Sequence, residues 1–109
     1  MMHMTKYQRL AERTARRDMD PRVRLAVAAL GLAGESGEVA DLVKKTLGHG
    51  HELDRDKLML ELGDVLWYLA ELATILEVDL HDVAHANVDK LVRRYPDGFS
   101  SHRSINRDD

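Results

Sequence analysis

Residues 58–76 carry the strongest structural signal in the chain: they read LMLELGDVLWYLAELATIL. Apolar residues recur here every three or four positions, which is the period of an α-helix and not the alternation of a β-strand. Glu61, Asp64 and Glu71 interrupt the run, and placing three charges in lipid would be prohibitive. We therefore expect a core helix here and no membrane span.

Helical periodicity extends through the rest of the chain, and no segment alternates over a strand's length. Capping residues, prolines and glycines set four predicted helices: Thr5 to about Arg17, Pro21 to about Leu47, Asp54 or Asp56 to about Leu76, and Leu80 to about Arg94. The first is predicted to begin with a capping box of Thr5 and Gln8. We therefore predict an all-α fold with one domain over residues 1–99. Residues 100–109 contain one aliphatic side chain and are expected to form a disordered tail.

Composition excludes several classes of protein. The 109 residues are 44% hydrophobic and 32% charged, as in a soluble globular domain. The absence of cysteine excludes disulfides, thiolate zinc sites, iron–sulfur clusters and cysteine nucleophiles. A net charge of −3 argues against nucleic acid as a partner, and the N-terminus lacks the apolar run of a signal peptide. We expect a cytoplasmic protein with no membrane partner.

Acidic residues occupy matching positions on the second and third predicted helices. Glu35 and Glu38 are spaced i, i+3 with the first in the apolar arc of its helix, and Glu61 and Asp64 repeat the pattern. One such carboxylate usually reaches solvent or meets an arginine, but four together repel one another. A dication would offset that repulsion. With no histidine partner at a coordinating spacing, oxygen ligands favour Mg²⁺, or Mn²⁺, over zinc or iron.

Three glycines, Gly31, Gly34 and Gly37, fall within the second predicted helix and each costs about 1 kcal/mol relative to alanine. Two interpretations are open. A neighbouring helix or a phosphate could approach the backbone closely there, or the helix could simply start later, near Glu35.

Several short motifs within residues 25–99, taken together, match the motif pattern of a known protein family. They are GLAGESGEVA at 31–40, Lys44-Lys45, Gly50-His51, ELGDVLWY at 61–68, Asn87, Lys90, and RYPDGF at 94–99. Together they resemble the MazG-like nucleoside triphosphate pyrophosphohydrolases. The resemblance implies an oligomeric four-helix bundle in which Glu35, Glu38, Glu61 and Asp64 bind Mg²⁺. It also implies hydrolysis of nucleoside triphosphates to nucleoside monophosphate and pyrophosphate, a housecleaning activity on the nucleotide pool.

The resemblance also suggests residues that contact the substrate. Asn87, Lys90 and Arg94 share one stripe of the fourth helix, and the family places polar and basic residues there around the nucleotide. Lys45 follows Glu38 on the same face and is a candidate phosphate ligand. Trp67 is either a platform for the base or ordinary packing. For the general base, Glu35 and Glu38 are equal candidates.

Self-association is expected because the third helix is apolar around most of its circumference, so one copy cannot cover it. Family members assemble as dimers or dimers of dimers, which predicts a homodimer or tetramer. The rival interpretation is a non-catalytic helical module that binds nucleotide or dimerises, with structural acidic pairs. A binding-only protein would keep its ligand affinity after Glu38→Gln, whereas a hydrolase would lose turnover.

Overall fold

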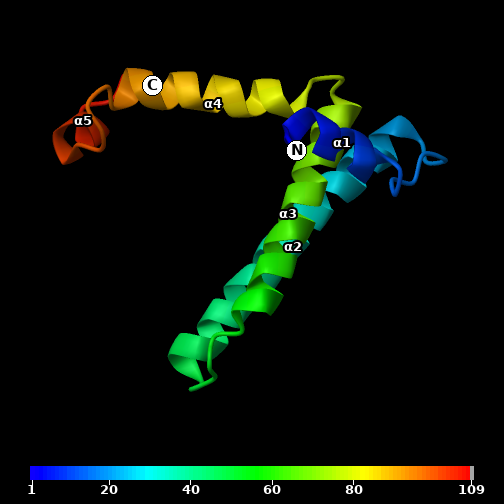
Figure 1. The fold of residues 1–109 in the computed structure, drawn as a ribbon, viewed down its shortest axis with the longest axis horizontal. Helices are drawn as coiled ribbons and strands as arrows, with labels where there is room; N and C mark the ends of the chain where they lie inside the picture. The colour runs from blue at the N-terminus through cyan, green and yellow to red at the C-terminus, as the bar shows by residue number, and fades with distance from the viewer. Residues whose placement is uncertain (109) are drawn as a thin grey trace.

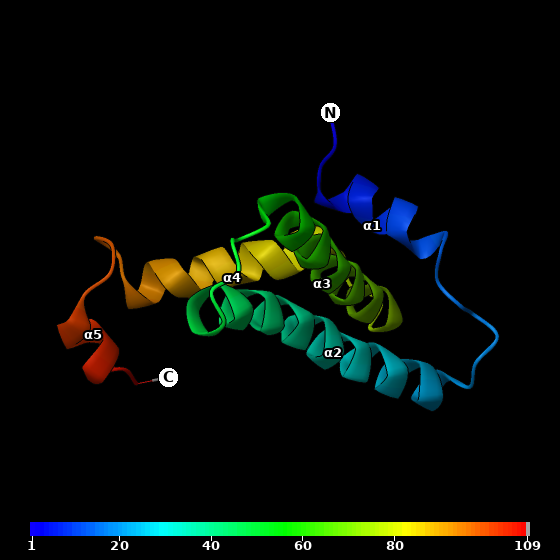
Figure 2. The same cartoon turned by 90° about the horizontal axis from the view of Figure 1, so that it is seen from below.

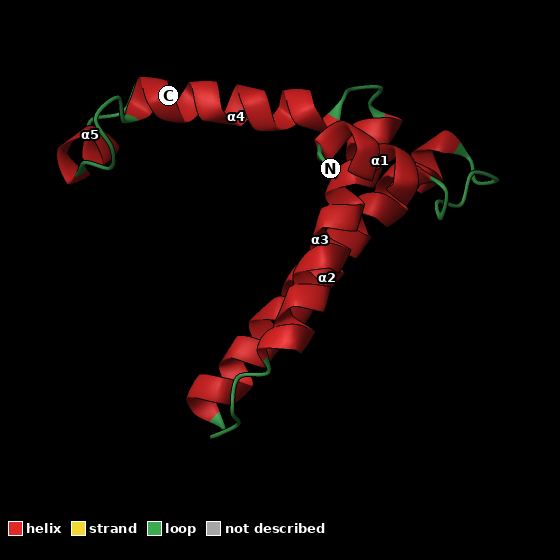
Figure 3. Ribbon diagram, in the orientation of Figure 1, coloured by secondary structure: helices red, strands yellow, loops and turns green. Residues whose placement is uncertain are grey.

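The computed structural model describes residues 1–108, which form five helices and no strand (Figure 3). The helices are α1 (Met4–Glu12), α2 (Pro21–Gly48), α3 (Arg55–Ile75), α4 (Leu80–Arg94) and α5 (Ser101–Ile105). The predicted all-α class is confirmed. The predicted number of helices is not, because α5 lies in the segment that was expected to be a disordered tail.

Aspartate side chains begin the three longest helices as the sequence predicts. Asp20, Asp54 and Asp79 each accept a hydrogen bond from a backbone N–H in the first turn. Pro21 occupies the first helical position of α2, where its missing N–H costs nothing. These caps fix the starts of α2, α3 and α4 to within a residue or two of the predicted ones.

The first helix departs from its prediction at both ends. It begins after His3 and ends at Glu12, earlier than the expected Arg17. Gln8 forms no capping box, because its amide donates to Thr74 and to the Val78 carbonyl. At the other end the Thr14 hydroxyl donates to the Ala11 carbonyl and accepts from the Trp67 indole. Contacts to α3 and its following turn therefore set the limits of α1.

A helical hairpin of α2 and α3 forms the main body of the molecule, and α1 packs across the end of α3 (Figures 1 and 2). From that end α4 projects away from the hairpin (Figure 1). The radius of gyration is 17.0 Å, whereas a compact chain of this length has one of about 13 Å. A single chain therefore does not close the predicted four-helix bundle.

The buried apolar core is small. Among the described residues it consists of Ala28, Ala70, Ala73 and Leu80. Large apolar side chains stay exposed on every major helix; examples are Leu30 on α2, Leu60 on α3 and Val88 on α4. Exposure of apolar surface to water is energetically unfavourable. These helix faces therefore lack a packing partner in the single chain. No helix within residues 1–108 is both long enough and apolar enough to cross a membrane.

One buried ion pair joins the two long helices. Glu71 on α3 is 7% exposed and is the buried charged residue of the described chain. Its two oxygens accept from Arg24 on α2, from Nη2 at 2.7 Å and from Nε at 3.0 Å. This hydrogen bonding raises the pKa of Arg24. The bidentate geometry fixes the register of α2 against α3.

Close packing explains why Gly31, one of the three glycines at positions 31, 34 and 37, has no side chain. A Cβ at this position would overlap Cε1 of Tyr68, so the ring occupies the space that a side chain would need. Gly34 and Gly37 have no atom within 4 Å of such a Cβ. Because α2 begins at Pro21, the interpretation of a helix starting near Glu35 is wrong. Close approach is correct for Gly31.

Candidate metal and nucleotide site

Three of the four predicted metal ligands come together between α2 and α3. Glu35, Glu61 and Asp64 each offer a carboxylate oxygen, and the three oxygens lie within 4.8 Å of one another. Glu61 and Asp64 are one turn apart on α3, and the helix pairing sets Glu35 of α2 beside them. We call these three residues the acid cluster.

Glu38 lies outside the acid cluster and is exposed. Three residues after Glu35, it is rotated by about 60° around the helix. Its charge still reaches Glu35, where it contributes to the raised pKa of that residue. The structure therefore places Glu38 at the margin of the group and not within it.

The carboxylates act on one another electrostatically. Partial burial raises the pKa of Glu35 above its ordinary value, and the charges of Asp64 and Glu61 raise it further. Asp64 also raises the pKa of Tyr7 on α1, after the larger effect of burial. Negative charge is thus concentrated between α2 and α3, which is the condition that a bound cation would relieve.

Aromatic side chains border the acid cluster. Trp67 and Tyr68 line a hollow of about 330 Å³ together with Glu35 and Asp64. Their rings meet edge to face, with centroids 5.0 Å apart. The Trp67 indole donates to Thr14 at 2.8 Å, which fixes the ring's position. An aromatic surface next to a carboxylate group suits a ligand that has both a base and phosphates.

Lys45 is held by an ion pair. Its ammonium lies 2.9 Å from Asp41, and Lys44 binds the same carboxylate at 2.9 Å. The two lysines lower the pKa of Asp41 to about 2. Asp41 also raises the pKa of Lys45, and the charge of Glu38 adds to this effect. Lys45 therefore lies near the margin of the site but is already engaged.

The predicted substrate residues on α4 are not brought to the acid cluster within one chain. Asn87 and Lys90 line a largely apolar groove of about 530 Å³ between α3 and α4. Leu66, which also lines this groove, points about 200° around α3 from Asp64. Arg94 lies at the end of α4. The acids and the α4 cations thus lie on different sides of α3.

Sequence reasoning missed Tyr68, which lines the hollow beside the acid cluster, and the effect of Asp64 on Tyr7. Tyr68 belongs to the quoted ELGDVLWY motif, so its place beside Asp64 could have been read from the motif. Tyr7 comes from a helix far away in sequence, and no local pattern signals its proximity to Asp64.

The structure is therefore that of a helical protein in which the α2–α3 hairpin places three carboxylates beside two aromatic rings. This arrangement is a candidate site for a cation and a nucleotide. The MazG nucleotide pyrophosphohydrolase domain matches residues 26–99, which include the acid cluster and all of α3 and α4. The chain belongs to this family, and the resemblance drawn from the motifs is confirmed.

A relative from a bacteriophage matches along nearly the whole chain. It is the Gene 37 protein of Mycobacterium phage L5, which is 40% identical over 114 residues. The match covers 97% of this chain and 100% of the relative. No solved structure matches the chain significantly.

Proposed function

We propose that the protein hydrolyses nucleoside triphosphates to nucleoside monophosphate and pyrophosphate in a reaction that depends on a divalent cation. The observation that carries the proposal is the acid cluster, with three carboxylate oxygens within 4.8 Å, in a chain of the MazG family. Trp67 and Tyr68 in the adjoining hollow support a nucleotide as the ligand. The proposed role is removal of unwanted nucleotides from the pool.

The donor set favours Mg²⁺, with Mn²⁺ as the other candidate. Glu35, Glu61 and Asp64 supply oxygen only, which hard cations prefer. Repulsion among the three, seen in the raised pKa of Glu35, fits a site that is completed by positive charge. When bound, Mg²⁺ would neutralise phosphate charge and act as a Lewis acid at a phosphoryl oxygen.

Within this proposal the protein's own residues have separate roles. Glu35, Glu61 and Asp64 would hold the cation, and the Trp67 and Tyr68 rings would position the base. Glu38 is outside the acid cluster and exposed, so its carboxylate is free to accept a proton from the attacking water. This assigns Glu38 in preference to Glu35 as general base. Lys45 is a candidate phosphate ligand once it leaves Asp41.

The active form is proposed to be a homodimer or tetramer. The open shape and small core of one chain leave the groove between α3 and α4 without a covering element. A second copy that covered this groove would bury apolar surface on both chains. Because the acid cluster and the Asn87, Lys90 and Arg94 stripe lie on different sides of α3 in one chain, we further propose that the assembly pairs the stripe of one copy with the acid cluster of another, where the cations would meet substrate phosphates.

A panel of nucleoside triphosphates with Mg²⁺ tests the activity, with pyrophosphate and orthophosphate measured separately. We expect pyrophosphate and monophosphate from at least one substrate and none in EDTA. In ¹⁸O-water, label in the monophosphate reports attack at the α phosphorus, and label in pyrophosphate reports attack at the β phosphorus. Release of orthophosphate and nucleoside diphosphate would contradict the proposal, as would nucleotide binding with no turnover across the panel.

A further inference from the structure

Two histidines lie side by side on the first half of α4, away from the acid cluster. His81 and His85 are spaced i, i+4, so they are neighbours on one face of the helix. Their ring centroids lie 6.3 Å apart, and both residues are exposed. Two histidines at this spacing on a helix can bind one metal ion between them. We call His81 and His85 the histidine pair.

A carboxylate supports one ring of the histidine pair. Oδ2 of Asp89, one further turn along α4, lies 3.2 Å from Nδ1 of His85. When Nδ1–H donates to this oxygen, Nε2 of His85 is left as the acceptor nitrogen of a neutral ring. Metal-binding histidines are commonly oriented by a carboxylate in this way. His85 and Asp89 therefore have the arrangement of a metal ligand and its supporting group.

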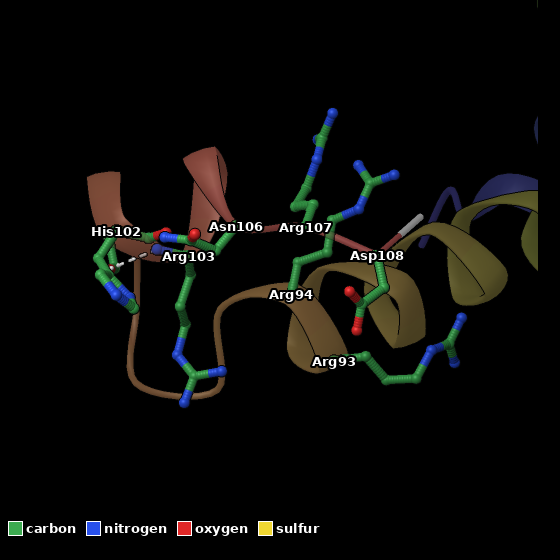
Figure 4. A pocket seen from close by; sticks show the side chains of 8 residues that line it. Arg93, Arg94, His102, Arg103, Asn106, Arg107 and Asp108 are labelled. Carbon is green, nitrogen blue, oxygen red and sulfur yellow. Dashed lines mark hydrogen bonds between the residues drawn. The ribbon is translucent and has the colours of Figure 1, made fainter.

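The charge of the first half of α4 also favours a cation. Residues 79–89 include three aspartates and no lysine or arginine. The basic residues of α4 come later, and Arg93 and Arg94 in its last turn point away from each other (Figure 4). A cation is therefore attracted to the part of α4 that carries the histidine pair and repelled from the opposite end of the helix.

The histidine pair is separate from the surfaces already assigned. At 100° per residue, His81 and His85 each lie about 160° around α4 from Val83, which lines the groove between α3 and α4. The acid cluster belongs to α2 and α3, and it offers oxygen atoms only. Imidazole nitrogen prefers Zn²⁺, Ni²⁺ or Cu²⁺ to Mg²⁺. A metal ion on the histidine pair would thus occupy neither the groove nor the acid cluster.

We propose that the histidine pair chelates a divalent transition-metal ion of the Zn²⁺ class, through Nε2 of His85 and a ring nitrogen of His81. Asp89 is a positioning residue that orients the His85 ring. Two nitrogens fill two of the usual four positions around Zn²⁺, and water fills the others. The chelate needs residues 81–85 to be helical, so the bound ion stabilises the first half of α4. This site does not depend on the proposed hydrolysis.

Titration of the full chain with ZnCl₂ at neutral pH tests the proposal, with ¹H–¹⁵N correlation spectra of the histidine rings as the readout. We expect Zn²⁺ to shift the ring-nitrogen resonances of His81 and His85 together. The spectra report histidine alone, so Zn²⁺ bound at the acid cluster does not affect the result. In calorimetry, His81→Asn/His85→Asn should weaken Zn²⁺ binding by about tenfold or more, and Asp89→Asn by a smaller factor. Circular dichroism checks that these exposed substitutions leave the helices folded.

The matched control removes two histidines from the turn after α2. His49 and His51 are exposed and lie on either side of Gly50, outside regular helix. We expect His49→Asn/His51→Asn to change the affinity for Zn²⁺ by less than about twofold, because a loop must lose conformational freedom before it can chelate. An equal loss in the two double variants would overturn the proposal. Unchanged His81 and His85 resonances, or displacement of Zn²⁺ from them by millimolar Mg²⁺, would overturn it too.

Discussion

Glu35 is the residue at which burial and neighbouring charge act together. Both raise its pKa above the ordinary value of 4.5, so the folded protein holds a proton there more tightly than the unfolded chain. The contribution of Glu35 to stability is therefore most favourable at low pH and is lost as pH rises from the ordinary pKa through the raised one.

We predict that, without metal, wild type loses stability relative to Glu35→Gln as pH rises from the ordinary carboxyl range toward neutrality. The amide has no charge to repel Asp64 and Glu61. Urea denaturation in EDTA at a series of pH values measures the difference between the two proteins. If the free energies of unfolding of the two proteins changed in parallel across that range, Glu35 would not be repelled by Asp64 and Glu61.

Gly31 gives a second prediction at the scale of one residue. Gly31→Ala should lower the free energy of unfolding by about 1–3 kcal/mol, because the new Cβ meets the Tyr68 ring and forces one of them to move. Gly37→Ala meets no atom within 4 Å and should raise stability by up to about 1 kcal/mol through helix propensity. Thermal and urea unfolding measure both changes. An equal loss at both positions would show that Tyr68 is not the cause.

Part of the site was predictable at this scale and part was not. The i, i+3 spacing of acids on two amphipathic helices predicts that Glu35, Glu61 and Asp64 face a shared interface, as the structure has them. The same spacing could not separate Glu38 from the group, because its exclusion depends on the exact rotation of α2 against α3. The approach of Tyr7 depends on tertiary packing of α1.

At the scale of the elements, the Arg24–Glu71 pair holds α2 against α3. Glu71→Leu should lower the free energy of unfolding by about 3–5 kcal/mol, because it leaves the mostly buried Arg24 charge without a partner. The double variant Arg24→Met/Glu71→Leu should recover most of that loss, since two apolar side chains then meet. Urea denaturation of the single and double variants completes the comparison. A double variant as unstable as the single one would contradict this account.

The helices themselves were largely predictable, because aspartate caps and Pro21 act locally. The first helix was not, since Gln8 bonds to α3 and to the turn that follows it instead of capping its own helix. Thr14 bonds both to the Ala11 carbonyl of α1 and to Trp67 of α3. The Arg24–Glu71 ion pair could not be predicted from the sequence either. Glu71 was visible as a charge within an apolar run, but no sequence pattern identifies a partner 47 residues away.

At the scale of the whole molecule, an open chain with exposed apolar helix faces should associate with itself. Sedimentation velocity at micromolar concentration should show a dimer or larger species in place of the 12.4 kDa monomer. Val83 lies on the groove between α3 and α4, so Val83→Asp should shift the protein toward monomer. His81→Asp, on the opposite side of α4, is the matched control and should leave the assembly intact. A monomeric wild type would contradict the prediction.

The direction in which α4 leaves the hairpin was not predictable, because it depends on the α3–α4 turn and on its contacts with α1. The Thr5 hydroxyl donates to Asp79, and the Gln8 amide oxygen accepts the Leu80 N–H. These contacts hold the base of α4 against α1, and local sequence carries no signal for them.

The most direct test of the central claim is Mg²⁺-dependent pyrophosphate release by matched single variants. Glu61→Gln keeps the size of the side chain but removes one charge from the acid cluster, and Glu52→Gln makes the same change at an exposed loop position outside it. We predict that Glu61→Gln loses at least hundredfold in kcat/KM, about 2.7 kcal/mol of transition-state stabilisation, and that Glu52→Gln stays within twofold of wild type. Wild-type turnover by Glu61→Gln, with Mg²⁺ present, would contradict the account.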